Sequence, residues 1–347
     1  MTMKEDLFRT ERDKINDYGQ TVNAILSFAA FIIHDGASQR PNSEFGIGRR
    51  MTTSSDNYIS PNSHITPDLV AQKSSQYGIV AEAKKSLGQN QSYWLRQLRQ
   101  LRKYDDILTG WWIDTEKIAH SDTVMLVHQS RGRLFVRFLE HQKEIEPDLV
   151  GPNTCVVEFI QSVETVAYHF FRLEFGIISD TELGKRLEDG VNIPLDNVRM
   201  SFPNIQFYDS SPPMPLLLSC LWNDLFSPMI EDVEYDEKTK SRKMTFSISE
   251  VTEELQKAFG SRALVKDQRS GEFPQYSWVK EAFERLVKYR LAVPCPGEDE
   301  KYTVHYRIFR DDVLDRFIKF ELDLVKRKNK KEIVGERQIK LFDDLEE

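Results

Sequence analysis

The alternation of apolar and polar residues predicts a mixed α/β region in the first half of the chain. Apolar residues recur at helical spacing from Asp6 to about His34, and a second helical pattern begins near Ser92 and ends near Leu108. Short apolar runs predict strands at Ile65–Ala71, Gly78–Lys84, Thr123–His128, Cys155–Ile160 and Ala167–Phe175. This order of elements predicts a mixed sheet flanked by helices.

The second half of the chain has a different pattern and predicts a second, α+β domain. The predicted helices are Pro215–Phe226, Ser249–Phe259 and Ser277–Arg290, and the predicted strands are Leu291–Pro294 and Tyr302–Phe309. Three helices followed by a β-hairpin is the order of a winged helix-turn-helix. Ser249 is the expected N-cap of its helix. We therefore expect an α/β domain at 1–180, a connector at 181–213, a winged-helix domain at 214–310, and a charged helix and flexible tail at 311–347.

Composition adds limits on location and partners. The 347 residues are 40% hydrophobic and carry a net charge of −8, so contacts with nucleic acid must come from local basic clusters. The three cysteines form no CxxC pair, which argues against a zinc site or a disulfide framework. The N-terminus lacks a signal-peptide pattern, and the apolar run Ala24–Ile33 is too short to span a bilayer. We expect a cytoplasmic protein with no membrane contact.

Asp68, Glu82 and Lys84 form the strongest candidate site in the sequence. Asp68 lies in one predicted strand, and Glu82 and Lys84 lie two positions apart in the next. Alternate side chains of a strand share a face, so Glu82 and Lys84 point away from the face that holds the apolar residues around them. A neighbouring strand can place the carboxylate of Asp68 beside that of Glu82.

Two adjacent carboxylates repel each other unless a cation lies between them, which favours Mg²⁺ or Mn²⁺ with oxygen ligands. The backbone carbonyl of Ala83 could add a third protein oxygen. The cation would hold a phosphate oxygen and lower the pKa of a bound water, and Lys84 would orient that water and offset charge on phosphorus. The alternative is a solvated sheet face with a surface ion pair, worth ~0–1 kcal/mol.

The helix predicted after this strand carries further polar residues. Gln97, Gln100 and Tyr104 share one helical face, where Gln can bind a water or nucleotide and Tyr can donate to phosphate. Its basic residues predict a surface that contacts a nucleic-acid backbone. These are Arg96, Arg99, Arg102 and Lys103. The alternative is a solvated basic helix.

The ordered motifs Pro67-Asp68, Glu82-Ala83-Lys84 and Gln100-Leu101-Arg102-Lys103-Tyr104 resemble the PD-(D/E)xK nuclease superfamily, in particular its RecB-like branch with a QxxxY motif. The resemblance covers about residues 5 to 130 and implies a restriction-endonuclease-like fold. It implies that Asp68 and Glu82 are metal ligands, that Lys84 is the catalytic lysine, and that Gln100 and Tyr104 support them. The family often adds an acidic residue from its first helix, for which Glu11 and Glu44 are both candidates.

The C-terminal tail and the third helix of the second domain suggest partners. The tail sequence Gln338-Ile339-Lys340-Leu341-Phe342 resembles the peptide with which bacterial proteins bind the sliding clamp, with Gln338 forming hydrogen bonds and Leu341 and Phe342 filling an apolar pocket. The alternative is that the tail folds back onto its own domain or packs in an oligomer. A recognition helix would carry Lys280, Arg285, Lys288 and Arg290, although the acidic turn Gly297–Glu300 would repel phosphates.

Together these features predict a metal-dependent nuclease that hydrolyses phosphodiester bonds of DNA. The resemblance is compatible with antiphage defence or DNA repair, together with a separately encoded ATPase or other partner. The alternative is a non-catalytic DNA-binding or adaptor protein that acts through the winged-helix domain.

Overall fold

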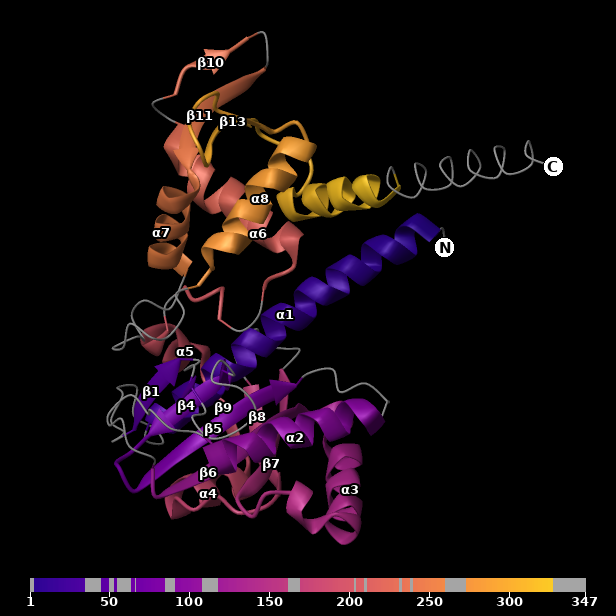
Figure 1. The fold of residues 1–347 in the computed structure, drawn as a ribbon, viewed down its shortest axis with the longest axis vertical. Helices are drawn as coiled ribbons and strands as arrows, with labels where there is room; N and C mark the ends of the chain where they lie inside the picture. The colour runs from indigo at the N-terminus through magenta and orange to yellow at the C-terminus, as the bar shows by residue number, and fades with distance from the viewer. Residues whose placement is uncertain are drawn as a thin grey trace, which may run out of the picture. The chain divides into compact units, whose positions relative to one another are not determined.

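A computed structural model gives the structure of the chain and describes residues 3–34, 45–49, 53–54, 64–65, 67–84, 91–107, 118–161, 169–202, 204–208, 211–230, 233–237, 240–259 and 273–326. The chain forms two compact units. The large-sheet unit comprises Gly19–Ser210 and Gln256–Phe273, and the small-sheet unit comprises Met1–Tyr18, Ser211–Leu255 and Pro274–Glu347. Figure 1 shows the elements of both units.

A seven-stranded mixed sheet forms the centre of the large-sheet unit, with the strand order β1-β4-β5-β6-β7-β8-β9. The strands β5, β6 and β7 are parallel to one another, and the other neighbouring pairs are antiparallel. The bounds are β1 (Gly46–Arg49), β4 (Leu69–Gln72), β5 (Tyr77–Lys84), β6 (His120–His128), β7 (Thr154–Gln161), β8 (His169–Phe175) and β9 (Val191–Ile193). A separate two-stranded sheet pairs β2 (Thr53–Ser54) with β3 (His64–Ile65).

Helices cover both faces of the large sheet. The second part of α1 (Met3–Ile33) packs on one face, where the rings of Phe28 and Phe171 have centroids 5.4 Å apart. The other face is covered by α2 (Gln91–Ile107) and α3 (Gln129–Ile145), which meet where Trp94 packs on Phe138 with ring centroids 5.1 Å apart. The unit also contains the 3-10 turn η1 (Pro147–Leu149), α4 (Thr181–Asp189) and α5 (Leu195–Ser201). The predicted mixed sheet flanked by helices is confirmed.

The small-sheet unit combines a four-stranded antiparallel sheet, in the order β10-β11-β13-β12, with helices. Trp222 lies in its core, and its ring stacks on those of Tyr306 and Phe309 at centroid distances of 4.9 and 5.1 Å. The elements in chain order are α6 (Met214–Cys220), the π-helical η2 (Leu221–Phe226), the 3-10 helix η3 (Ser227–Ile230), β10 (Tyr235–Asp236), β11 (Ser241–Ser247), α7 (Ile248–Phe259), α8 (Tyr276–Lys288), β12 (Ala292–Pro294), β13 (Lys301–Tyr306) and a helix over 313–326.

Several elements differ from those predicted. The strand predicted at Ile65–Ala71 is broken before Asp68, and its two parts, β3 and β4, belong to different sheets. The predicted connector at 181–213 contains α4, α5 and β9, the last strand of the large sheet. The helix α3 and the strand β11 were absent from the prediction. No helix in the described residues combines the length and apolar character that crossing a bilayer requires.

Candidate functional site

The candidate site lies where β4 begins and β5 ends. These strands are antiparallel, and Leu69 of β4 is opposite Ala81 of β5. The same register places Asp68, the residue before β4, opposite Glu82. Asp68 and Glu82 are both buried, each with 2% relative exposure. The interpretation of this sheet face as solvated is therefore wrong, because the hydrophobic cluster under α2 covers it.

Glu82 is the centre of a hydrogen-bond network. Its Oε1 accepts hydrogen bonds from Gln100 Nε2 at 3.1 Å and from the hydroxyl of Tyr104. Its Oε2 forms an ion pair with Lys84 Nζ at 3.1 Å. The structure thus brings together the strand residues and the helix residues that the sequence singled out.

Asp68 is tied to the same strand by its backbone. The N–H of Ala83 donates to Asp68 Oδ2 at 2.9 Å, a buried hydrogen bond that crosses from β5 to the start of β4. Pro67 precedes it and has no N–H to donate to a sheet ladder. The break in the predicted strand therefore has a physical cause, and it leaves the Asp68 carboxylate beside the end of β5.

The helix α2 positions Gln100 and Tyr104 through its buried apolar side. Leu98 and Leu101 are buried in the cluster between α2 and the sheet, and Tyr104 is 1% exposed. Gln100 and Tyr104 lie four residues apart, on one side of the helix. Gln100 Nε2 also donates to the Tyr104 hydroxyl at 2.8 Å, so the two side chains hold each other in place.

The environment of Tyr104 keeps its hydroxyl protonated. Burial raises the pKa of Tyr104 well above its usual range, and the negative charges of Glu82 and Asp68 raise it further. A phenol with a raised pKa stays a hydrogen-bond donor at neutral pH. Its proton therefore remains available to Glu82, whose charge that hydrogen bond stabilises.

The donor set suits a hard cation such as Mg²⁺. Asp68, Glu82 and the carbonyl of Ala83 offer oxygen ligands, and Mg²⁺ characteristically keeps several waters beside one or two carboxylates. Among the described residues, no group of three or more His, Cys, Asp and Glu side chains is placed to hold a metal. Glu11 belongs to the small-sheet unit and pairs with Lys14 at 2.6 Å, while Glu44 lies outside the described residues.

The basic residues of α2 have different surroundings. Arg99 and Lys103 are exposed, and the Arg96 guanidinium lies 5.6 Å from the ring centroid of Tyr93. Arg102 Nε donates to the carbonyl of Asp148 at 3.1 Å, which fixes α2 to the turn after α3. Arg102 therefore has a structural contact, whereas Arg99 and Lys103 present their charge to solvent.

The helix α3 adds basic residues that the sequence interpretation missed. Arg133 and Arg137 are exposed and Arg131 is half-buried on this helix, which packs beside α2. Its buried residues Phe135, Phe138 and Leu139 recur at helical spacing and could have revealed it.

Glu158 is a further acidic residue on the covered face of the large sheet. It shares a row across the parallel strands with Val127 and Lys84. Two strand spacings, about 10 Å, separate its backbone from that of Lys84. Burial raises the pKa of the Glu158 carboxyl, and the charge of Glu174 raises it further.

The predicted recognition helix of the small-sheet unit is α8, and carboxylates neutralise two of the basic residues predicted for it. Lys280 pairs with Glu300 at 3.1 Å, and Arg285 pairs with Glu321 at 3.2 Å and Glu281 at 3.1 Å. The clamp-binding residues Gln338, Leu341 and Phe342 lie outside the described residues.

No protein-family model matches this chain, and neither a curated protein nor a solved structure does.

Proposed function

We propose that the protein is a metal-dependent nuclease that hydrolyses phosphodiester bonds of DNA. The observation that carries this proposal is the convergence on Glu82 of Lys84, Gln100 and Tyr104, with Asp68 opposite it. These residues come from β5, from α2 and from the position before β4, and they match the acidic, lysine and QxxxY motifs of the PD-(D/E)xK superfamily in type and order. Charged residues are seldom buried unless they are paired, and here buried Glu82 has hydrogen-bond or ion-pair partners at both of its oxygens.

Each residue has a role that its contacts support. Asp68, Glu82 and the Ala83 carbonyl would hold Mg²⁺ or Mn²⁺, which supplies a positive charge for the phosphate and a more acidic water when it is bound. Lys84 would orient the attacking water and offset negative charge on the phosphoryl oxygens. Gln100 and Tyr104 would keep the Glu82 carboxylate oriented, since both donate to its Oε1. We also propose that the large-sheet unit has a restriction-endonuclease-like fold.

The exposed basic residues of α2 and α3 would bind the nucleic-acid backbone. Arg99 and Lys103 of α2, with Arg137 of α3, offer charges without a carboxylate partner among the described residues. Arg133 of α3 is also exposed, although its charge acts in part on the Glu158 carboxyl. Phosphate contacts of this kind give affinity that is independent of sequence and falls with salt.

We also propose that the small-sheet unit is a winged-helix domain. The chain order α6, β11, α7, α8, β12 and β13, with β11 and β12 both paired to β13, supports this assignment. The strand β11 between the first and second helices is the element that the sequence interpretation lacked. An adaptor protein that acts only through this domain is the competing function, and it predicts binding without cleavage.

The deciding experiment is a cleavage assay on linear, circular and single-stranded DNA, and on RNA, with and without Mg²⁺ or Mn²⁺. We expect wild-type cleavage that requires the metal and that falls roughly 10²-fold or more in Asp68→Ala and Lys84→Ala. The matched controls are Asp189→Ala and Lys185→Ala, exposed residues of α4 in the same unit. DNA binding without cleavage under any of these conditions would favour the adaptor and overturn the nuclease.

A further inference from the structure

Three adjoining hollows lie on the small-sheet unit, outside the candidate site. Their volumes are about 260, 410 and 290 Å³. Arg290 lines the first two and Arg307 lines the last two, so the hollows follow one another along the surface. The basic residues that line them are Lys288, Arg290, Arg307, Arg310 and Arg316. We call this surface the arginine hollows.

The positive charges of the arginine hollows are largely uncompensated. Among the described residues, Arg290, Arg307 and Arg310 have no carboxylate within ion-pair distance. Asp311, one of two acidic residues in the lining, already faces Lys319 at 3.1 Å and Arg316 at 3.7 Å. The Arg316 Nε is buried and has no hydrogen-bond acceptor in the described part of the chain. The surface therefore attracts an anion, and the exposed guanidinium groups of Arg290, Arg307 and Arg310 are the donors that such an anion can reach.

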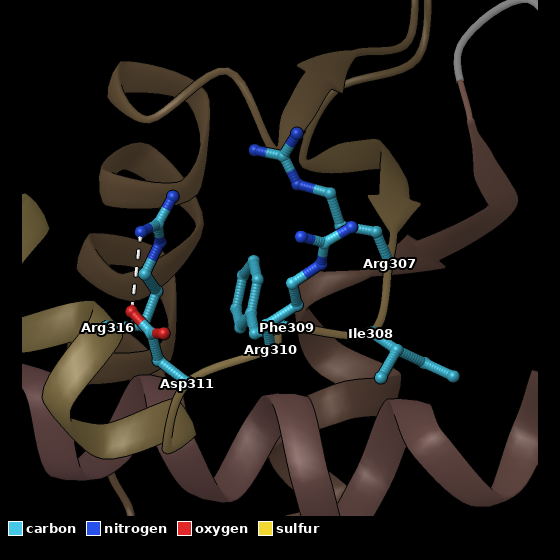
Figure 2. Close-up of a pocket in the computed structure, with 6 residues that line it drawn as sticks. All are labelled: Arg307, Ile308, Phe309, Arg310, Asp311 and Arg316. Carbon is cyan, nitrogen blue, oxygen red and sulfur yellow. Dashed lines mark ion pairs between the residues drawn. The ribbon is translucent and has the colours of Figure 1, made fainter.

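Aromatic packing holds the segment that carries these arginines. Figure 2 shows the Phe309 ring between the side chain of Arg316 and those of Arg307 and Arg310. The Trp222 ring stacks on Phe309 with an interplanar angle of 8°, and Trp222 Nε1 donates to the carbonyl of Arg307 at 3.1 Å. The backbone at 307–309 is thus anchored to the core, while Arg307 and Arg310 remain exposed.

We infer that the arginine hollows bind the phosphodiester backbone of a nucleic-acid strand. A row of joined hollows with five basic residues fits a linear polyanion better than a single phosphate. Ile308, which is 82% exposed beside the arginines, offers an apolar contact for a base. The strand would lie at Lys288 and Arg290, at the end of α8, and not at Lys280 and Arg285, which are paired with carboxylates. This inference rests on the proposed function in one respect, which is the identification of the polyanion as a nucleic acid.

The test is strand binding by the full chain in an Asp68→Ala background, which removes cleavage. Fluorescence anisotropy with a labelled single-stranded oligonucleotide compares Arg307→Glu/Arg310→Glu with the charge-matched control Arg9→Glu/Lys240→Glu, whose exposed sites lie outside the hollows. We expect the first pair to raise the Kd tenfold or more, and to lower the salt slope of binding by about 1 to 2. Equal Kd values for the two double variants would overturn the inference.

A second variant separates binding from folding. Arg290 follows α8 with a left-handed backbone, at φ 61°, a position where glycine is favoured. Arg290→Gly should therefore melt at the same temperature as the parent or higher, yet bind the strand several-fold more weakly. Unchanged binding by this variant would contradict the placement of the strand at the end of α8.

Competitors distinguish the ligand classes. A nucleic-acid strand should displace the labelled oligonucleotide at far lower concentration than inorganic phosphate, a mononucleotide or polyglutamate. Equal competition by polyglutamate would assign the hollows to an acidic protein and overturn the inference. If the wild type cleaves DNA but the Arg307 and Arg310 reversals leave the Kd for the strand unchanged, this inference fails and the proposed nuclease stands. If the hollows bind a strand but the wild type does not cleave, the nuclease fails and this inference stands.

Discussion

At the scale of single residues, the candidate site depends on the orientation of one carboxylate. Both oxygens of Glu82 have protein partners, with Lys84 on one side and Gln100 and Tyr104 on the other. A buried charge without such partners would be costly, so each donor contributes to the stability of the unit as well as to the geometry of the site. Stability and activity should therefore change together when a donor is removed.

We expect Tyr104→Phe to lower the free energy of unfolding by about 1 to 3 kcal/mol, because Glu82 loses a buried hydrogen bond to its charged oxygen. Urea unfolding measures this change, and the cleavage assay should show a parallel loss of rate. Tyr93→Phe on the same helix is the control, since the Tyr93 hydroxyl has no hydrogen bond among the described residues. Equal stabilities for the two variants would show that the Tyr104 hydroxyl does not support Glu82.

His169 predicts a dependence of stability on pH. Burial lowers the pKa of His169 from 6.5 to about 4, and its Nδ1 lies 3.1 Å from Ser27 Oγ. Below pH 6.5 the unfolded chain takes up a proton that native His169 does not bind, so stability falls as the pH drops from about 6.5 to about 4. The full loss is roughly 3 kcal/mol. Unfolding curves of wild type and His169→Gln should converge over this window, whereas the exposed His141→Gln should keep the wild-type slope.

At the scale of elements, local patterns predicted β5 and α2 within about one residue, because their apolar periodicity and their flanking polar residues agree. The position of Asp68 opposite Glu82 also followed from strand pairing. The hydrogen bonds from Gln100 and Tyr104 to Glu82 could not be predicted in this way, because they depend on how α2 packs across the sheet. Tertiary contacts of this kind leave no periodic signal in the chain.

The start of α7 shows how side-chain caps shift an element. The sequence favoured Ser249 as the N-cap, but the structure places it inside the helix, which begins at Ile248. Ser247 Oγ accepts from the N–H of Glu250 at 3.2 Å, and Glu250 Oε2 accepts from the N–H of Ser247 at 3.1 Å. This reciprocal capping box uses a serine and a glutamate three residues apart, a spacing that was legible in the sequence.

Gly176, at the end of β8, should be intolerant of any side chain. Its φ is +79°, and a Cβ there would lie 2.4 Å from the carbonyl oxygen of Thr154 on β7. We expect Gly176→Ala to lower the free energy of unfolding by about 2 kcal/mol or more, since strain and a backbone clash act together. Gly297, with φ +75° and nothing within 4 Å of a Cβ, is the matched control and should lose only about 1 kcal/mol. Similar losses at both positions would show that β7 and β8 pack more loosely than the structure has them.

At the scale of the whole molecule, charge is distributed unevenly. The chain has a net charge of −8, yet exposed basic residues gather on α2 and α3 in one unit and around the arginine hollows in the other. A net negative protein that binds nucleic acid must do so through such local surfaces, and its binding must weaken steeply with salt. If nucleic acid binds as we propose, each unit supplies its own surface for a strand.

Binding at two surfaces predicts a step in affinity as the strand lengthens. Once a strand is long enough to occupy both surfaces, the second contact becomes intramolecular and the Kd should fall by about 10²-fold or more, depending on the chain between the units. Anisotropy titrations of the Asp68→Ala protein with single strands of increasing length would measure it. The step should disappear in Arg307→Glu/Arg310→Glu, which weakens strand binding at the arginine hollows. It should also disappear in Arg99→Glu/Lys103→Glu, which weakens strand binding at α2. A Kd that falls only in proportion to strand length would mean that a strand binds one surface at a time, since extra length then adds only equivalent positions for the same contact.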